Sequence, residues 1–127
     1  MPRFVTFVAL LLGALYLASC VITPPGAGDQ VLLGHRFVGS SGWLASAAHG
    51  VFFLWLAYAS WRRRSVAVSG QIGYCVYMIE NIWIYSIGEG REYFRGFYSM
   101  LLVNAVVTAV LLAICRIILQ RRAVFDR

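Results

Sequence analysis

The sequence predicts an all-α integral membrane bundle of four transmembrane helices joined by short loops. Of its 127 residues, 61% are hydrophobic and 13% are charged, whereas a soluble domain has about 25% charged residues. Four apolar segments each approach the ~20 residues that an α-helix needs to cross a bilayer. We therefore expect a single membrane domain over residues 1–127, with lipid as the partner of its apolar surface.

The first two segments cover residues 4–22 and 42–61. The first ends at the Pro-Pro-Gly sequence of residues 24–26, because proline lacks an amide hydrogen and disfavours helix at the residue before it. The second ends at three consecutive arginines, residues 62–64. These charges stop an apolar span and begin a short turn.

The third and fourth segments cover residues 66–87 and 97–119. A Gly-Glu-Gly sequence at residues 88–90 ends the third segment. The fourth ends where Gln120 is followed by two arginines. The connections on both sides of the third segment are short, so consecutive helices should be antiparallel neighbours.

Positive charge gathers on one side of these predicted spans. The other side has a balanced charge, with Arg36, Arg91 and Arg95 against Asp29, Glu89 and Glu92. An excess of arginine marks the cytoplasmic side, so both termini and the 62–64 turn should be cytoplasmic, in a bacterial inner (plasma) membrane. The formal charge of +6 fits this membrane surface, and no nucleic acid partner is expected. The arginine-rich side holds Arg3, Arg62, Arg63, Arg64, Arg116, Arg121, Arg122 and Arg127, with Asp126 as its one acid.

The end of the first segment also fits a bacterial lipoprotein signal. Leu17-Ala-Ser-Cys20 follows a basic, apolar start, and cleavage there would leave Cys20 as a lipidated N-terminus with three remaining spans. Four spans put every charged connection on a consistent side of the membrane, so we favour the uncleaved first helix.

The external loop, residues 23–41, contains an apolar stretch from Gln30 to Val38. This stretch is apolar enough to lie in the membrane interface as a short amphipathic helix, which would cover the outer end of the bundle. We favour the alternative, a simple connection between the first two spans.

Two ionisable residues lie deep within the apolar segments, His49 and Glu80. Counted from the shared 62–64 turn, they rise about 18 and 21 Å along their helices at 1.5 Å per residue. The sequence therefore predicts a His49–Glu80 contact at one depth in the membrane. Ionisable groups at such depth are costly and often functional.

Further polar residues reach the same level and complete a candidate polar layer in the outer half of the membrane. Its alternative role is structural, because polar side chains hydrogen-bond between helices and contribute about 0.6 kcal/mol each on average. Small residues should allow close helix approach beside this layer, above all between the second and third helices. The layer consists of Glu80, His49, Asn104, Tyr16 and Asn81, and the small packing residues are Ser46, Gly50 and Gly73.

No catalytic or phosphate-binding motif is present, and two histidines, one of them in a loop, predict neither a metal site nor a cofactor. We therefore expect a non-catalytic accessory or structural subunit of a membrane complex, or an oligomeric scaffold, rather than an enzyme. Its partners would be other membrane subunits or further copies of the chain. One alternative is an oligomeric proton-linked transporter or channel using Glu80 and His49. The other is a membrane enzyme that uses these two residues as acid and base on a lipid or quinone.

Overall fold

The computed structural model describes residues 2–120 and 122–124, so Arg121, Asp126 and Arg127 of the charge pattern lie outside the described residues. Four long helices occupy the four predicted apolar segments, and each begins and ends within two residues of the expected position. Three of them, α1, α2 and α4, are long and apolar enough to cross a membrane. The helices are α1 (Pro2–Ile22), α2 (Ser40–Trp61), α3 (Ser65–Ile87) and α4 (Phe97–Gln120).

The loop between α1 and α2 forms a β-hairpin, so it is neither the short interfacial helix nor the simple connection that the sequence analysis considered. Strands β1 (Asp29–Leu32) and β2 (His35–Val38) pair antiparallel. Leu33 and Gly34 join them, and both have positive φ, 50° and 79°. A two-residue connection of this kind matches the twist of the flanking strands, and it reverses the chain where a helix would have to continue. Three short 3₁₀ turns complete the structure: η1 (Pro25–Ala27), η2 (Arg91–Tyr93) and η3 (Arg122–Val124).

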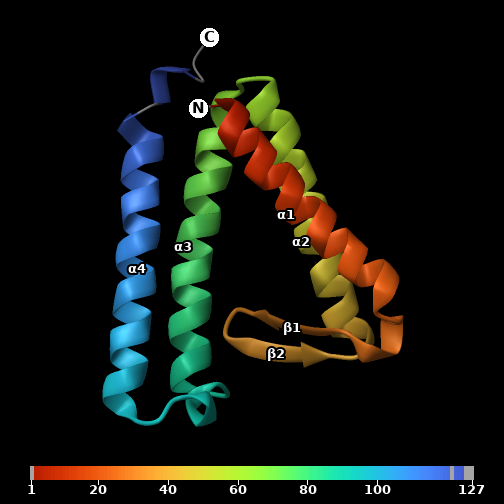
Figure 1. The fold of residues 1–127 in the computed structure, drawn as a ribbon, viewed down its shortest axis with the longest axis vertical. Helices are drawn as coiled ribbons and strands as arrows, with labels where there is room; N and C mark the ends of the chain where they lie inside the picture. The colour runs from red at the N-terminus through yellow and green to blue at the C-terminus, as the bar shows by residue number, and fades with distance from the viewer. Residues whose placement is uncertain (1, 121, 125–127) are drawn as a thin grey trace.

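The four helices form two antiparallel pairs (Figure 1). Helix α1 runs along α2, and α3 runs along α4. The pairs converge where α1 begins, where the α2–α3 turn lies and where α4 ends. Toward the opposite end they separate, and the β-hairpin crosses the space between α2 and α3.

Small residues hold the α1–α2 pair together. A Cβ atom added to Gly50 would lie 2.8 Å from the Leu17 side chain, and one added to Gly13 would lie 3.2 Å from the Gly50 carbonyl oxygen. A hydrophobic cluster extends this contact with Ala9, Phe53, Leu56 and Ala57. The expectation that Gly50 and Ser46 line the contact between α2 and α3 is therefore wrong. Gly50 faces α1, and Ser46 Oγ lies 3.5 Å from Gln30 Oε1 in β1.

Hydrogen bonds between side chains join α3 to α4. Trp83 Nε1 donates to Thr108 Oγ1 at 2.9 Å, and Ser86 Oγ donates to Asn104 Oδ1 at 3.1 Å. At the converging end, a hydrophobic cluster connects the two pairs; it contains Ala59, Ala67, Val68 and Ile118.

Candidate functional site

The base of the β-hairpin is anchored to α1 and α2. The Gly39 amide donates to the Gly28 carbonyl at 2.7 Å. A side chain at Gly28 would collide with the Trp43 backbone, so the start of α2 sits directly against the hairpin. The Trp43 indole donates to the Cys20 carbonyl at 2.8 Å, which ties the end of α1 to the same place.

The tip of the hairpin is attached to α3 by one buried amide. Asn81 Oδ1 accepts a hydrogen bond from the Gly34 amide at 2.7 Å, and Asn81 Nδ2 lies 3.4 Å from the Val31 carbonyl oxygen. A Cβ at Gly34 would collide with Ile84. Glycine at the turn therefore permits both the positive φ and the close approach to α3.

An exposed charged cluster fixes the outer edge of the hairpin. The Arg36 amide donates to Glu89 Oε2 at 2.9 Å, and His35 Nδ1 lies 3.2 Å from Glu89 Oε1. The Arg36 guanidinium binds both carboxylate oxygens of Asp29, at 2.9 and 2.6 Å. The guanidinium lowers the pKa of Asp29, and Asp29 in turn raises the pKa of Arg36. The Arg36 amide, together with His35, lowers the pKa of Glu89.

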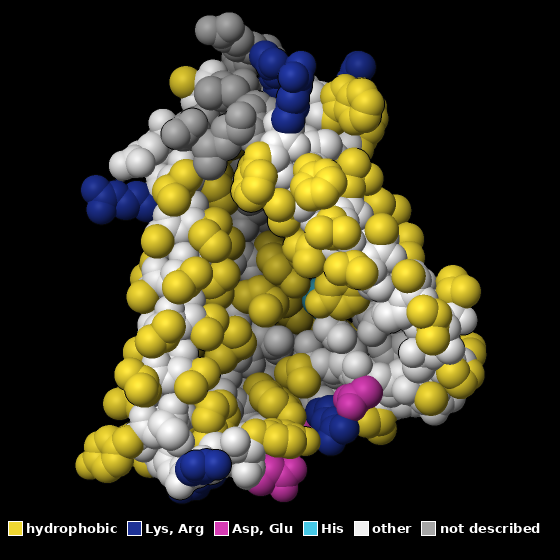
Figure 2. Space-filling view, viewed as in Figure 1, with side chains coloured by type: hydrophobic (Ala, Val, Ile, Leu, Met, Phe, Trp, Pro, Cys, Tyr) yellow, Lys and Arg dark blue, Asp and Glu magenta, His cyan; other side chains and the backbone are white. Residues whose placement is uncertain are grey.

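The space that the hairpin borders contains two adjoining cavities, both open to the outside. One, of about 420 Å³, lies between α2 and α3. The other, of about 370 Å³, lies toward α1 and the hairpin, and His49 and Tyr74 line both. Figure 2 shows the hollow between the helix pairs, with mainly hydrophobic side chains around it. The first cavity is lined by Leu32, Ala45, Ala48, His49, Phe52, Gly70, Gly73, Tyr74 and Tyr77.

His49 is at the centre of this space, and its imidazole is 8% exposed. Its Nδ1 lies 2.8 Å from the Ala45 carbonyl oxygen. A carbonyl only accepts, so Nδ1 carries the proton and donates. Tyr16 stacks on the imidazole with ring centroids 5.3 Å apart. Tyr74 and Tyr77 approach it from α3, at 6.2 and 6.0 Å between ring centroids.

The structure brings three of the five residues of the predicted polar layer together. Tyr16, His49 and Asn81 all line the second cavity, where Tyr16 stacks on His49 and Asn81 also binds the hairpin. Asn104 lies elsewhere, fully buried between α3 and α4 with Ser86.

Glu80 does not contact His49. It is exposed and has no hydrogen bond or ion pair with another described residue. Consecutive residues in a helix point about 100° apart, a consequence of 3.6 residues per turn. Because Asn81 faces the hairpin, Glu80 points away from it. The expected His49–Glu80 pair is therefore absent, and the α3 residues that approach His49 are Tyr74 and Tyr77.

An outward stripe on α3 surrounds Glu80. Its members recur every three or four residues, which puts them on one helix face. A Cβ added to Gly73 would meet nothing within 4 Å, so the predicted packing glycine faces open space in this chain. The stripe consists of Ser69, Gly73, Val76 and Glu80, all exposed.

The predicted polar layer did not include Tyr74 and Tyr77, although both line the central space. Their spacing from Asn81 carried a usable signal: residues 74, 77, 78, 81 and 85 share one helix face. Met78, Asn81 and Tyr85 line the second cavity together with Tyr74.

Comparison with known proteins gives no relative for this arrangement. No protein-family model matches the chain, and searches of curated proteins and of solved structures found no match. Within residues 2–120 and 122–124, no group of three or more His, Cys, Asp or Glu side chains is placed to hold a metal ion. The function must therefore be argued from the geometry of this chain.

Proposed function

We propose that the chain is a four-span membrane protein that acts as a non-catalytic subunit of a larger membrane assembly. Helices α1, α2 and α4 are apolar enough to span a bilayer, and long runs of exposed side chains on α1 and α4 are hydrophobic. Lipid is the solvent that suits such surfaces. Helix α3 pairs with α4 over most of its length (Figure 1) and would cross the membrane with it.

The charge distribution supports an orientation in a plasma membrane in which both termini are on the cytoplasmic side. Arg3, the 62–64 turn and Arg122 are at the converging end of the helices (Figures 1 and 2). The opposite end carries the mixed charges of the hairpin and of Glu89. By the positive-inside rule, the arginine-rich end is cytoplasmic and the hairpin is external.

The exposed side chain of Glu80 is the observation that carries the subunit proposal. Glu80 is two-thirds of the way along α3 and lacks a partner among the described residues. A carboxyl group that faces hydrocarbon without a hydrogen-bond partner is costly, and acids in membrane spans usually face protein or water. A second protein at this face of α3 would supply the missing contact.

The residues around Glu80 suit a helix–helix contact. Ser69 and Gly73 form a small-xxx-small pair on the same exposed face, and such pairs let two membrane helices approach closely. We propose that a transmembrane helix of a different subunit, with a polar or basic group at the depth of Glu80, packs along this stripe. A symmetric contact between two copies would place two Glu80 carboxyl groups together, so we favour a different partner.

The transport and enzyme alternatives have lost the contact that motivated them. Both required Glu80 and His49 to act on one proton or substrate, and the two residues share no hydrogen bond. General acid–base catalysis requires both groups within hydrogen-bond reach of the reacting atoms. The geometry favours a binding role for Glu80 instead.

The subunit proposal is tested by the size of the solubilised protein. Wild-type protein extracted from its native membrane in mild detergent should migrate as an assembly larger than the 14.2 kDa chain in its micelle. Glu80→Leu should release a folded monomer, because it removes the polar contact and leaves an apolar helix face suited to lipid. Glu80→Gln, which retains hydrogen bonding, should preserve much of the assembly.

Val106→Leu is the matched control, since Val106 is 55% exposed on α4, away from the stripe. This variant should assemble as the wild type does. A monodisperse wild-type monomer would overturn the proposal. If the assembly is unchanged by Glu80→Leu, the contact surface is not the Glu80 face of α3.

A further inference from the structure

We propose that the cavity between α2 and α3 binds an uncharged, membrane-soluble molecule whose ring carries a hydroxyl group, of the chemical class of the quinols. The inference concerns Nε2 of His49, the ring nitrogen that does not bond the Ala45 carbonyl. It does not depend on the subunit role. The cavity of about 420 Å³ is within the range of small-molecule sites, which are mostly apolar with a few placed polar groups.

The first argument is the free nitrogen of His49. Nδ1 donates to the Ala45 carbonyl, so Nε2 of the uncharged imidazole is a hydrogen-bond acceptor. Among the described residues, His49 has one hydrogen bond, the one at Nδ1, and Nε2 is not one of the fully buried atoms without a partner, so it is open to the cavity. A ligand that shields this acceptor from water without supplying a donor would bind at a cost. The group that satisfies Nε2 must be a donor, which a hydroxyl is and a carbonyl is not.

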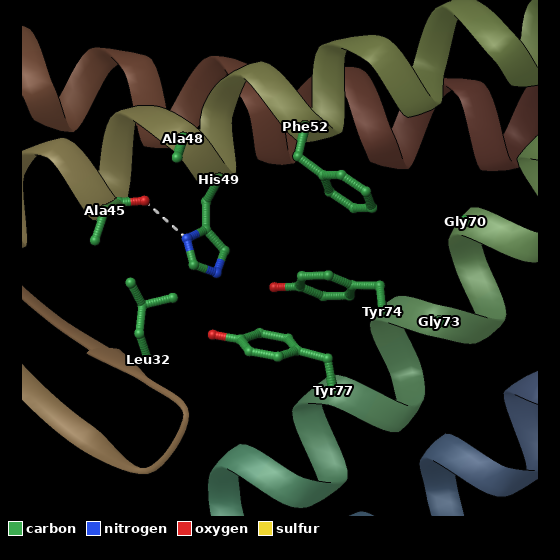
Figure 3. Close-up of a pocket in the computed structure, with 9 residues that line it drawn as sticks. All are labelled: Leu32, Ala45, Ala48, His49, Phe52, Gly70, Gly73, Tyr74 and Tyr77. Atoms are coloured by element: carbon green, nitrogen blue, oxygen red, sulfur yellow. Dashed lines mark hydrogen bonds between the residues drawn. The ribbon is translucent and has the colours of Figure 1, made fainter.

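The second argument is the hydroxyl group of Tyr77. It is buried and makes no hydrogen bond of good geometry with the described residues, although the Leu33 backbone lies near it. Figure 3 shows the Tyr74 and Tyr77 side chains extending from α3 into the cavity, with their hydroxyl groups beside the His49 imidazole and toward Leu32. A tyrosine hydroxyl can donate. The two rings have centroids 6.0 Å apart, so a ligand hydroxyl that donates to His49 Nε2 would accept from Tyr77 once the Tyr77 side chain turns its hydroxyl into the cavity.

The walls of the cavity indicate the rest of the ligand. Among its nine lining residues, none is Asp, Glu, Lys or Arg, so a charged molecule would find no opposite charge. The Phe52 and Tyr74 rings stack with centroids 5.5 Å apart, and they present flat aromatic surfaces to the space (Figure 3). Aromatic rings prefer offset-stacked or edge-to-face neighbours, which favours a flat ring as the occupant.

One glycine on α3 leaves the cavity open along the helix. Gly73 lines it and is exposed with open space beside it. In a membrane-spanning chain this opening lies within the membrane, at the edge of the stripe proposed for the partner helix, so a ligand with an alkyl tail would enter sideways from the bilayer beside that helix. The ring would reach His49 while the tail stays between the helices and lipid.

The probe that tests this site is a benzoquinol with a decyl tail, kept reduced and offered to the purified chain in detergent micelles. Equilibrium dialysis against protein-free micelles measures its binding. Saturable binding at one molecule per chain is expected. The dimethyl ether of the same quinol cannot donate to Nε2 and should bind at least about fivefold more weakly, the worth of one hydrogen bond.

Variants of the chain separate the polar contacts from simple partitioning. Tyr77→Phe should weaken quinol binding about fivefold and leave the unliganded protein at least as stable, because it removes an unpaired buried hydroxyl. His49→Phe should abolish the preference for quinol over its ether. Tyr98→Phe is the control for Tyr77→Phe, since Tyr98 is 84% exposed at the start of α4; it should bind as the wild type does.

Three outcomes would overturn the proposal. The first is equal retention of the quinol and its ether, which would reflect partitioning into the micelle. The second is unchanged binding in a folded Tyr77→Phe variant. The third is no saturable binding, which would leave water as the occupant of the polar end of the cavity.

Discussion

The two helix pairs use different means to stay together. Helices α1 and α2 approach through glycine, with Gly13 opposite Gly50, and fill the contact with small and apolar side chains. Helices α3 and α4 are joined by side-chain hydrogen bonds, Trp83 to Thr108 and Ser86 to Asn104. The α1–α2 contact depends on two positions having no side chain, Gly13 and Gly50. The α3–α4 contact depends on hydrogen bonds between polar side chains.

The comparison also explains the space between the pairs. Helices α2 and α3 follow each other directly in the chain. Along most of their length they are joined neither by close approach at glycines nor by hydrogen bonds between side chains. They meet near the turn, where Gln71 Nε2 donates to Ser60 Oγ at 3.2 Å, and then diverge (Figure 1). Aromatic rings and the β-hairpin occupy the widening gap. A short connection thus makes two helices neighbours without making them pack.

Gly50→Leu should have the largest effect on stability. The new side chain would push against Leu17 and Tyr16, and overpacking costs about 1–3 kcal/mol or more where atoms cannot yield. Unfolding by a denaturing detergent should shift to lower concentration. Val51→Leu is the control, because Val51 is exposed on the same helix. Equal stability of the two variants would contradict the α1–α2 contact through Gly50.

Asn81→Leu should have the next largest effect, at the hairpin. It leaves the Gly34 amide without its acceptor, and a buried donor without a partner costs about 1–3 kcal/mol. The hairpin should separate from α3 while the helix pairs remain folded. Faster hydrogen exchange at the Gly34 amide would report this opening, and helix amides should keep their protection. Unchanged exchange at Gly34 would show that Asn81 does not hold the tip.

Asn104→Leu should cost less than either. It breaks the bond from Ser86, but it also removes the Asn104 amide nitrogen, which is buried without a partner. Interhelical hydrogen bonds in membrane proteins average about 0.6 kcal/mol, so the free energy of unfolding should fall by about this amount. A loss as large as that of Gly50→Leu would mean that α3–α4 depends on its polar contact far more than we infer.

The smallest expected effect is a pH dependence of the hairpin edge. The pKa of Glu89 is lowered in the folded chain by the Arg36 amide and His35. This contact is therefore complete above the ordinary carboxyl pKa, about 4.3, and weakens as the pH falls through the lowered value. Exchange at the Arg36 amide, corrected for its intrinsic rate, should accelerate there.

The Gly34 amide provides an internal control for this titration, because its acceptor, Asn81, is uncharged. Its protection should not follow the protonation of Glu89. Glu89→Gln should remove the pH dependence at Arg36. Parallel acceleration at both amides would indicate general acid unfolding instead of local release.

The positions of the helices along the chain could be predicted from the sequence, but which face of each helix meets which neighbour could not. Apolar length and arginine clusters mark where each helix begins and ends. Depth along a helix is predictable approximately, since His49 meets Tyr77, which is one turn of α3 before Glu80. Orientation differs by about 100° between Glu80 and Asn81, and either residue is a plausible partner for His49 from sequence alone. The contact with the hairpin, which selects Asn81, depends on the fold.

The hairpin escaped prediction for a related reason. Its strands are short, and residues 30–38 are apolar enough for either a helix or a strand. Leu33-Gly34 was the usable signal, since glycine at such a position favours a two-residue reversal. Ser46 and Gly50 were assigned to the contact between α2 and α3. Small residues indicate that another helix approaches closely, but they do not indicate which helix it is.

The most direct test of the proposed subunit role is photo-crosslinking in the native membrane. A photoreactive phenylalanine analogue would replace Val76, on the exposed stripe of α3, or Val106, on the exposed face of α4. The analogue at Val76 should give a discrete product heavier than the chain, containing a second membrane protein, and the analogue at Val106 should give none. Products of equal yield from both positions, or none from Val76, would contradict a partner helix at Glu80.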